Sequence, residues 1–481
     1  MSSQPTLFWH DYESFGADPR RDRPSQFAGI RTDLDLNEIA EPVEWFCQPA
    51  DDFLPHPDAC LITGITPQDA QKNGVPEAEF IANIHSELSQ PNTCSLGYNS
   101  LRFDDEMTRH TLYRNFYDAY GREWQNGNSR WDLIDVARTA YALRPDGIEW
   151  PLNDQGLPSF KLEHLTAANG ISHEGAHDAV SDVRATIALA RLIREKQPKL
   201  YEHLFALRNK HKVSDQLDLV SRKPVLHISG MFGAARGNAA VVVPLAQHPT
   251  NKNGVICYDL MVDPAELGSL SAEEIRHRVF TAQAELSQPR IPLKVIHINR
   301  CPVVLPVSMV DEKVEARTGI GLQTCREHWK VLSALGDITS KLQAVFSEPS
   351  DGVAGSDDPD LMLYGGGFFG HHDKDQMEII RETPAEALSE LEPAFQDPRL
   401  NEMFFRYKAR NFKDWLTGEE LQQWDEYRWQ RINDPAVSSL TPEQFNQRLV
   451  ELSQTELSQR DQAILEDVVL YVESLVPSHL F

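Results

Sequence analysis

The chain has 481 residues, too many for one ordinary hydrophobic core, and this length predicts about three domains. It carries 46 Lys and Arg residues against 72 Asp and Glu residues, which gives a formal net charge of −26. That balance argues against nonspecific adhesion to nucleic acid or anionic membranes, so a role in nucleic-acid binding requires a local basic track.

Residues 1–198 alternate between strand-like and helix-like patterns. Amphipathic periodicity predicts helices over 131–143 and 179–197. Short apolar or alternating runs predict strands over 7–15, 26–34, 43–50 and 94–99. Because strands and helices alternate, we expect an α/β domain with a mixed sheet.

Residues 199–350 are richer in short β-type runs, and the Asn253-Gly254 pair within them is a hairpin signal. We expect a small barrel-like β domain there. The stretch 347–360 is rich in Ser, Asp, Gly and Pro, which is typical of a linker. The β-type runs cover 224–229, 239–246, 254–262 and 293–298.

Residues 351–481 have a mostly helical pattern. Thr441 as N-cap, Pro442 at the first helical position and Gln444 three residues after the cap predict a helix start. The run GGGFFGHHDKD at 365–375 lacks both a phosphate-loop Lys-Ser/Thr pair and metal-ligand spacing, so it favours a surface loop.

The six cysteines form no C-x-x-C pair and have no histidine neighbours at zinc spacing. We therefore expect free thiols, as in a reducing cytoplasm. The sequence shows no export signal and no run of about 18 apolar residues, so we expect no membrane association.

Two carboxylates lie two positions apart in the first predicted strand. Asp11 and Glu13 point to the same face of the strand, because successive side chains alternate. A hard divalent cation such as Mg²⁺ between them would make such a pair tolerable in a buried site. Taken alone, this spacing is more often explained by an edge strand with a solvated polar face.

Two later segments carry further acidic residues. Asp104, Asp105 and Glu106 follow a short strand at the start of a predicted helix, a place where the helix dipole alone also favours acids. The segment 173–190 contains two overlapping His-x4-Asp frames, His173 with Asp178 and His177 with Asp182. We favour the second frame, because it opens the cleaner amphipathic helix. A histidine at a helix start is, taken alone, more often a cap or a surface group.

Together these motifs resemble the three exonuclease motifs of the DEDD superfamily, histidine subclass. They read Asp-x-Glu at Asp11, Asn-x3-Phe-Asp ending at Asp104, and His-x-Ala-x2-Asp-x3-Thr from His177. The segments HDYESFG, GYNSLRFDDE, NSRWDLIDV, GLPSFKLEHLTAANGI and YKARNF resemble more narrowly the bacterial exonuclease I family, which are single-strand-specific 3′→5′ deoxyribonucleases. The likeness covers nearly the full length and is weakest in 303–400 and after 430.

The resemblance implies an architecture. We expect a ribonuclease H-like exonuclease domain with a mixed sheet over 1–198, a small SH3-like β-barrel domain over 199–350 and a C-terminal helical domain over 351–481. The implied activity is processive hydrolysis of single-stranded DNA to 5′-mononucleotides in DNA repair and recombination.

The resemblance also implies a metal site with two Mg²⁺ ions, for which Mn²⁺ could substitute. Asp11 would bridge both ions, Glu13 and Asp182 would bind the ion on the nucleophile side, and Asp104 the other. His177 would accept the proton of the attacking water, a task that suits an unperturbed pKa near 6.5. Asp105 is left out of this ligand set, because the family's ligand follows the aromatic residue directly.

Contacts to DNA are expected along 109–131, where arginines alternate with aromatic residues. Half or more of these aromatic residues would equally serve the core. Glu13 also lies near the substrate in this interpretation. The candidates for substrate binding outside the metal site are Arg109, Arg114, Arg130, Trp131 and Lys161.

The family implies one protein partner, the single-stranded DNA-binding protein, whose acidic C-terminal tail would dock on a basic-rimmed apolar pocket. Arg144 and Lys223 are our candidates for that rim. We expect a monomer. Two rival functions remain at this point, a ribonuclease of the same superfamily and a noncatalytic nucleic-acid-binding protein with a decayed nuclease domain.

Overall fold

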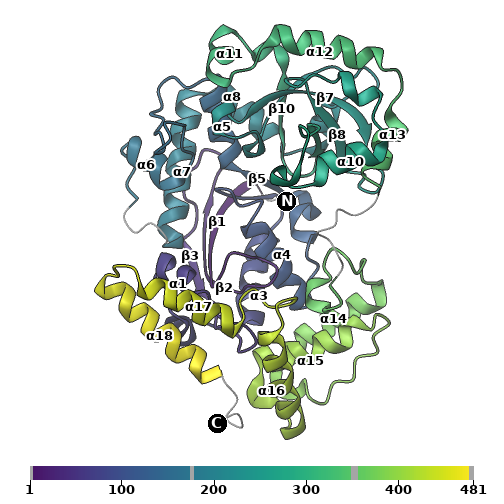
Figure 1. Cartoon of the computed structure of the whole chain (residues 1–481). Coiled ribbons are helices and arrows are strands. Elements are labelled where there is room, and N and C mark those ends of the chain that lie inside the picture. Colours follow the sequence, from purple (N-terminus) through teal and green to yellow (C-terminus); the bar gives the residue numbers. More distant parts are fainter. Residues whose placement is uncertain (1–3, 174–177, 348–355, 476–481) are drawn as a thin grey trace. The chain divides into compact units, whose positions relative to one another are not determined.

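The computed structural model describes residues 4–173, 178–347 and 356–475. The chain forms two compact units (Figure 1). The first combines Met1–Ser129, Glu174–Arg184 and Gly355–Phe481, and the second combines Arg130–His173 and Ala185–Ala354. The predicted domain boundaries at residues 198 and 350 stay predictions.

A mixed sheet forms the centre of the first unit. The first four of its five strands follow the order β3-β2-β1-β4, where β1 runs antiparallel to β2 and parallel to β4. The register places Asp11 opposite Ala28 and Glu13 opposite Gln26. The mixed sheet predicted from the sequence is thereby confirmed. The strands are β1 (Thr6–Ser14), β2 (Pro24–Thr32), β3 (Val43–Phe46) and β4 (Thr93–Gly97).

Helices α3 and α4 of the first unit share an apolar core with the sheet. Phe8 and Tyr12 of β1 lie in one cluster with Phe80 of α3 and Met107 of α4, and all four are buried. Burying large aromatic side chains in this way is the main stabilising contribution of such a layer. The helices are α1 (Pro57–Thr63), α2 (Pro67–Asn73), α3 (Glu77–Leu88) and α4 (Asp104–Arg114).

The C-terminal helices pack against the N-terminal part of the same unit. Figure 1 shows α17 and α18, in yellow, beside α1, and a second cluster buries Phe53 and Cys60 together with Phe445 and Val468. The predicted start of α17 is confirmed, since Thr441 forms a capping box with Gln444. These helices are α14 (His371–Glu382), α15 (Arg399–Asn411), α16 (Gly418–Asn433), α17 (Pro442–Ser453) and α18 (Gln459–Leu475).

The second unit contains a five-stranded sheet in the order β10-β6-β7-β8-β9, with every pair antiparallel. This agrees with the predicted β domain. The hairpin indicated by Asn253-Gly254 is confirmed, since β7 and β8 are antiparallel neighbours. Its loop is longer than a two-residue turn, because it spans 248–253 and Gly254 already begins β8. The strands of this sheet are β6 (Val225–Ile228), β7 (Ala239–Gln247), β8 (Gly254–Asp259), β9 (Leu293–His297) and β10 (Val303–Pro306). The fifth strand of the mixed sheet is β5 (Ser129–Asp132), where the chain passes from the first unit to the second.

Helices occupy more of the second unit than its β-rich sequence predicts. α7 (Ala179–Lys196) begins in the first unit and ends in the second. The others are α5 (Leu133–Leu143), α6 (Leu162–Ala168), α8 (Pro198–Ala206), α9 (Lys210–Gln216), α10 (Ala272–Phe280), α11 (Glu312–Thr318), α12 (Leu322–Ala334) and α13 (Thr339–Val345).

Three further sequence predictions can be compared with the structure. None of the six cysteines, all within the described ranges, forms a disulfide. The predicted linker at 347–360 lies largely outside the described residues, and the predicted loop at 365–375 is wrong in its second half, where His371 begins α14. No helix of the described ranges is long and apolar enough to cross a membrane.

Candidate metal centre

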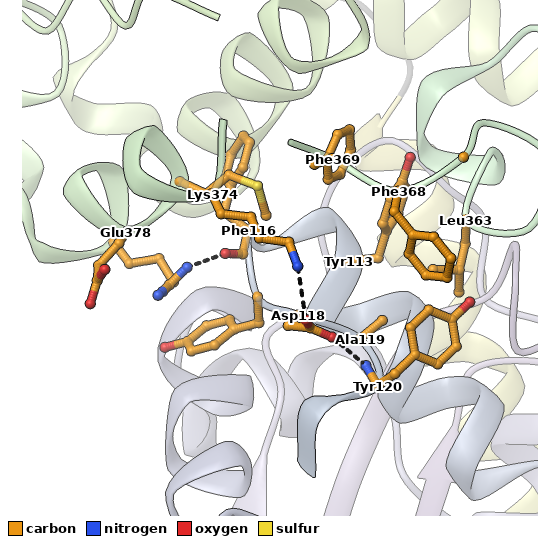
Figure 2. Close-up of a pocket in the computed structure, with 14 residues that line it drawn as sticks. Tyr113, Phe116, Asp118, Ala119, Tyr120, Leu363, Phe368, Phe369, Lys374 and Glu378 are labelled. Carbon is orange, nitrogen blue, oxygen red and sulfur yellow. Dashed lines mark hydrogen bonds and ion pairs between the residues drawn. The ribbon is translucent and has the colours of Figure 1, made fainter. Parts of the chain in front are cut away.

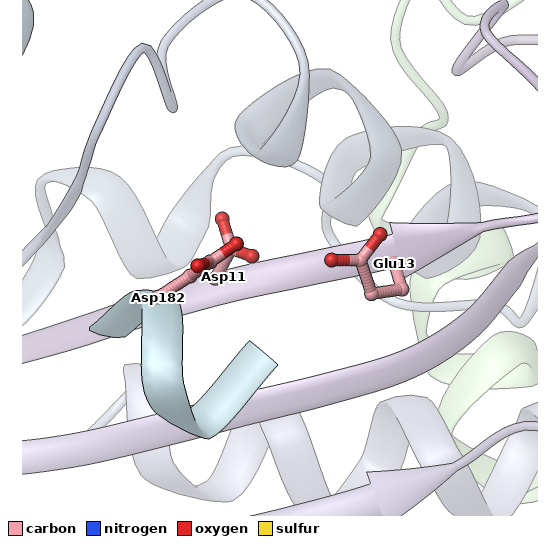
Figure 3. Close-up of side chains that lie close together, drawn as sticks. All are labelled: Asp11, Glu13 and Asp182. Atoms are coloured by element: carbon pink, nitrogen blue, oxygen red, sulfur yellow. The ribbon is translucent and has the colours of Figure 1, made fainter. Parts of the chain in front are cut away.

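Three carboxylates meet at the middle of β1. Asp11 and Glu13 lie on the same face of this strand, and Asp182 is in the first turn of α7. One ligand oxygen from each lies within 4.8 Å of those of the other two (Figure 3). The separation is short enough for one cation to contact all three groups.

The structure separates the two His-x4-Asp frames. Asp178 lies on the surface, where its Oδ2 accepts a hydrogen bond from the backbone N–H of Ser181 at 3.0 Å at the start of α7. Asp182, one turn later, is the residue that lies with Asp11 and Glu13. His173 Nδ1 is 3.1 Å from Thr166 Oγ1. His177 lies outside the described residues, so its role as general base stays a prediction.

Asp104 is the first residue of α4, and its side chain is hydrogen-bonded to β1, the strand that carries Asp11 and Glu13. Its Oδ1 accepts a hydrogen bond from the backbone N–H of Tyr12 at 3.0 Å. Tyr12 lies between Asp11 and Glu13, so this bond places the Asp104 carboxylate beside β1. The end of β4 also lies close to β1 here. A Cβ atom at Gly97 would be only 2.5 Å from the carbonyl oxygen of His10, so this position requires glycine.

Burial and mutual repulsion make these acids hard to ionise. Burial, together with the charge of Asp182, raises the pKa of Asp11 well above its usual value. Burial and the charges of Asp11 and Asp182 raise the pKa of Glu13 to about 9. Burial and the charge of Asp11 raise the pKa of Asp104. Such strain is relieved by a cation, and an all-oxygen carboxylate set suits Mg²⁺ or Mn²⁺, so the residues present fit a divalent metal.

Two of the arginines predicted to contact DNA form ion pairs with other side chains of the protein. The Arg109 guanidinium bonds Glu123 at 2.7 and 2.9 Å, and that of Arg114 bonds Glu77 at 2.7 Å. Both arginines are buried. A buried, fully paired guanidinium has little left with which to neutralise a phosphate, which favours a structural role for both.

Arg130 and Trp131 have similar surroundings in the second unit. Arg130 donates to the carbonyl of Asn299 at 3.3 Å, and the Trp131 ring packs edge-on against Tyr201 and Phe205. Both are buried. The remaining candidate, Lys161, precedes α6 with 68 % of its side chain exposed, so it is able to reach a ligand.

The two predicted rim residues of the partner site, Arg144 and Lys223, are both exposed on the second unit. Arg144 follows α5 and donates to the carbonyl of Leu143 at 2.7 Å. Their exposure is compatible with docking of an acidic peptide.

A separate cavity of ≈ 210 Å³ lies in the first unit between the end of α4 and α14 (Figure 2). Its walls are mainly aromatic, with Tyr113, Phe116 and Phe369 among them. Three of its charged side chains are engaged, since Lys374 contacts Asp118 at 3.2 Å and Arg381 donates to the carbonyl of Phe116. It offers no carboxylate cluster comparable to that on β1.

Three family models together cover most of the chain. The model described as Exonuclease matches residues 8–190, Exonuclease I SH3-like domain matches 208–348 and Exonuclease I C-terminal domain matches 357–475. Exodeoxyribonuclease I of Escherichia coli K12 is 50% identical over 428 residues, which is 89% of this chain and 90% of that protein. The chain belongs to the exonuclease I family.

Solved structures of exonuclease I agree with this membership. The Methylocaldum szegediense enzyme matches with a TM-score of 0.94 and 48% identity, and an E. coli complex with a dA16 oligonucleotide matches with 0.92 and 47%; each covers 98% of this chain and 100% of that one. A zinc-bound E. coli complex with single-stranded DNA has a TM-score of 0.92 at 46% identity, and an SSB/Exonuclease I complex 0.89 at 45%, with the same coverage.

Membership settles the class of the protein. It is an exodeoxyribonuclease and therefore a hydrolase. The predicted order of an exonuclease fold, an SH3-like domain and a C-terminal domain is confirmed.

Proposed function

We propose that this chain degrades single-stranded DNA from its 3′ end to 5′-mononucleotides by metal-dependent phosphodiester hydrolysis. The observation that carries the proposal is the convergence of Asp11, Glu13 and Asp182 on one face of β1 within 4.8 Å. The relatives that resemble the chain over almost its full length include complexes with single-stranded DNA.

Asp11, Glu13 and Asp182 would bind one divalent ion, and Asp11 with Asp104 a second. Such ions, when bound, neutralise the phosphate, activate a water and stabilise the leaving oxygen. The chain's own contribution is to hold the carboxylates in place, as the Tyr12 N–H does for Asp104. His177 would accept the proton of the attacking water.

We infer that Mg²⁺ is the working metal, with Mn²⁺ as a substitute, because the donors are all carboxylate oxygens. Zinc in the E. coli complex belongs to that structure. We infer two ions per site, because Asp104 adds a fourth carboxylate to the cluster of Asp11, Glu13 and Asp182.

Binding of substrate and partner extends the proposal beyond the metal. Lys161 is the exposed candidate for a DNA phosphate contact. Arg144 and Lys223 would contact the acidic C-terminal tail of a single-stranded DNA-binding protein, in keeping with the SSB/Exonuclease I complex. We infer a processive, monomeric, cytoplasmic enzyme of DNA repair and recombination, divided into domains at residues 198 and 350.

The test uses 5′-labelled single-stranded DNA, single-stranded RNA and blunt duplex DNA, each with Mg²⁺ and with EDTA. We expect shortening of the DNA single strand from its 3′ end with Mg²⁺ only. Preferential cleavage of RNA would favour the ribonuclease alternative. Binding without cleavage under every condition would contradict the proposal and favour the noncatalytic alternative.

A further inference from the structure

Asp105 is not directed at the acidic cluster, although it is next to Asp104. Successive helical residues point about 100° apart, and the Asp105 carboxylate instead receives Arg122 Nη2 at 2.5 Å. Both side chains are almost fully buried. Removing one partner of such a buried ion pair is strongly destabilising, because the other charge is left buried without a counter-charge or water.

Arg122 ties this pair to the central sheet. It belongs to the short 3-10 helix η1 (Gly121–Glu123), and its Nη1 donates to Ser95 Oγ on β4 at 3.2 Å. Ser95 is paired in register with Phe8 of β1. The start of α4 is thus linked through Asp105 and Arg122 to the strands beside Asp11.

The next residue of η1 holds the following turn of α4. Glu123 accepts two hydrogen bonds from Arg109, which also bonds Glu106 at 2.8 Å. η1 itself is fixed by Asp118, whose Oδ1 accepts from the N–H of Gly121 at 3.0 Å. Arg122 and Glu123 of η1 therefore form ion pairs with the first two turns of α4. Arg122 supplies the positive charge of its pair, and Glu123 supplies the negative charge of the other.

We propose that Arg122 and Glu123 are positioning residues that fix Asp104 for metal binding, acting through Asp105 and Arg109. The proposal rests on the proposed function, in which Asp104 is a metal ligand. Tyr12 defines where the Asp104 carboxylate points, and the η1 contacts define where the helix that carries it begins. Supporting contacts of this kind are commonly worth 10- to 100-fold in metal affinity, so we expect a shift of about tenfold.

The test measures Mn²⁺ binding to the metal-free full-length protein by isothermal titration calorimetry, without DNA. Arg122→Gln and Asp105→Asn should each weaken Mn²⁺ binding about tenfold, and the double variant should be little weaker than either single one, because both remove the same ion pair. Arg122→Lys should recover part of the affinity. An unchanged affinity in Arg122→Gln, or a double variant showing the full product of the single effects, would overturn the proposal.

Arg406→Gln is the matched control, because Arg406 is equally buried and pairs with Asp360 in the C-terminal part of the unit. It should lower the unfolding temperature without changing Mn²⁺ affinity. If Arg122→Gln does not fold, Arg122→Lys and Asp105→Asn decide, and unchanged affinity in both overturns the proposal.

Asp104→Asn separates this proposal from the proposed function. If Asp104→Asn still binds both ions, the ligand assignment itself is wrong. If Asp104→Asn loses one ion while Arg122→Gln binds both with unaltered affinity, only the positioning role fails.

Discussion

Asp104 and Asp178 are two carboxylates at helix starts with different surroundings. Asp104 is buried beside β1 and accepts a hydrogen bond from Tyr12, whereas Asp178 is exposed and caps α7. Their positions relative to a helix are nearly the same, so local structure alone does not distinguish them. The distinction comes from the third element, the strand that carries Asp11 and Glu13.

Asp104→Ala should reduce hydrolysis of single-stranded DNA by several orders of magnitude, because it removes a ligand of one metal. Binding of the single strand should be largely kept, as a gel-shift assay in EDTA can measure. Asp178→Ala is the control and should cost only the stability of a helix cap, about 1 kcal/mol. Near-normal activity of Asp104→Ala would be inconsistent with its place in the site.

The raised pKa of Glu13 gives a prediction for stability. Its pKa rises from 4.5 to about 9 in the folded, metal-free chain, so the folded state binds more protons than the unfolded state between these values. Stability from this group therefore falls as the pH rises through that window. Glu13→Gln cannot ionise, so in EDTA its unfolding temperature should exceed that of the unmodified chain by a margin that grows from pH 5 to pH 9. A margin that shrinks with pH would contradict the assignment.

Site residues differ in how far the sequence reveals them. Alternation along one strand is enough to place Asp11 and Glu13 on one face. The burial of Arg109 and Arg114 depends on Glu123 and Glu77, which lie 14 and 37 residues away. No local sequence pattern predicts pairings over such separations. A segment rich in arginine and aromatic residues therefore predicts DNA contacts even where its arginines form ion pairs inside the fold.

At the scale of elements, α17 shows how a local signal becomes a stable helix. Thr441→Ala removes the hydroxyl that accepts the N–H of Gln444 and should lower the free energy of unfolding by about 1 kcal/mol. Thr441→Ser keeps the hydroxyl and should restore most of it. Hydrogen exchange in 442–453 measures the change locally, and equal exchange in both variants would count against a role for the cap.

The strands of the first unit and the start of α17 were predictable because each has a regular period or a capping box. Helices α10, α11 and α13 were not, since α10 lies between two β-type runs and α11 and α13 have only seven residues each. His371 begins α14 directly after Gly370, where the glycine-rich run suggested a loop throughout. In these cases packing decides between helix and loop where the sequence pattern is ambiguous.

At the scale of the whole chain, segments far apart in sequence share one interior. Asp52 pairs with Arg410 at 2.7 Å, and Arg410 also pairs with Asp360 at 2.5 Å. Burial alone would raise the pKa of Asp52, but the charges of Arg410, Arg23 and Arg431 hold it well below its usual value. The same unit buries Phe53 and Cys60 against Phe445 and Val468. The C-terminal helices therefore complete the interior of the unit that carries the metal site.

A chain ending at residue 198 should consequently fail to behave as an independent nuclease. The truncation would remove Arg410, the ion-pair partner of Asp52. It would also expose to solvent the apolar side chains that pack against α17 and α18. We expect aggregation and loss of cooperative unfolding, measured by size-exclusion chromatography and circular dichroism. A soluble, cooperatively folded fragment would show that the N-terminal part has a sufficient core of its own.

Anomalous diffraction from crystals of the full chain grown with Mn²⁺ tests the central claim most directly. The account predicts two anomalous peaks, both within bonding distance of Asp11, one also bound by Glu13 and Asp182 and the other by Asp104. Peaks located elsewhere, or none near Asp11 at saturating Mn²⁺, would contradict it.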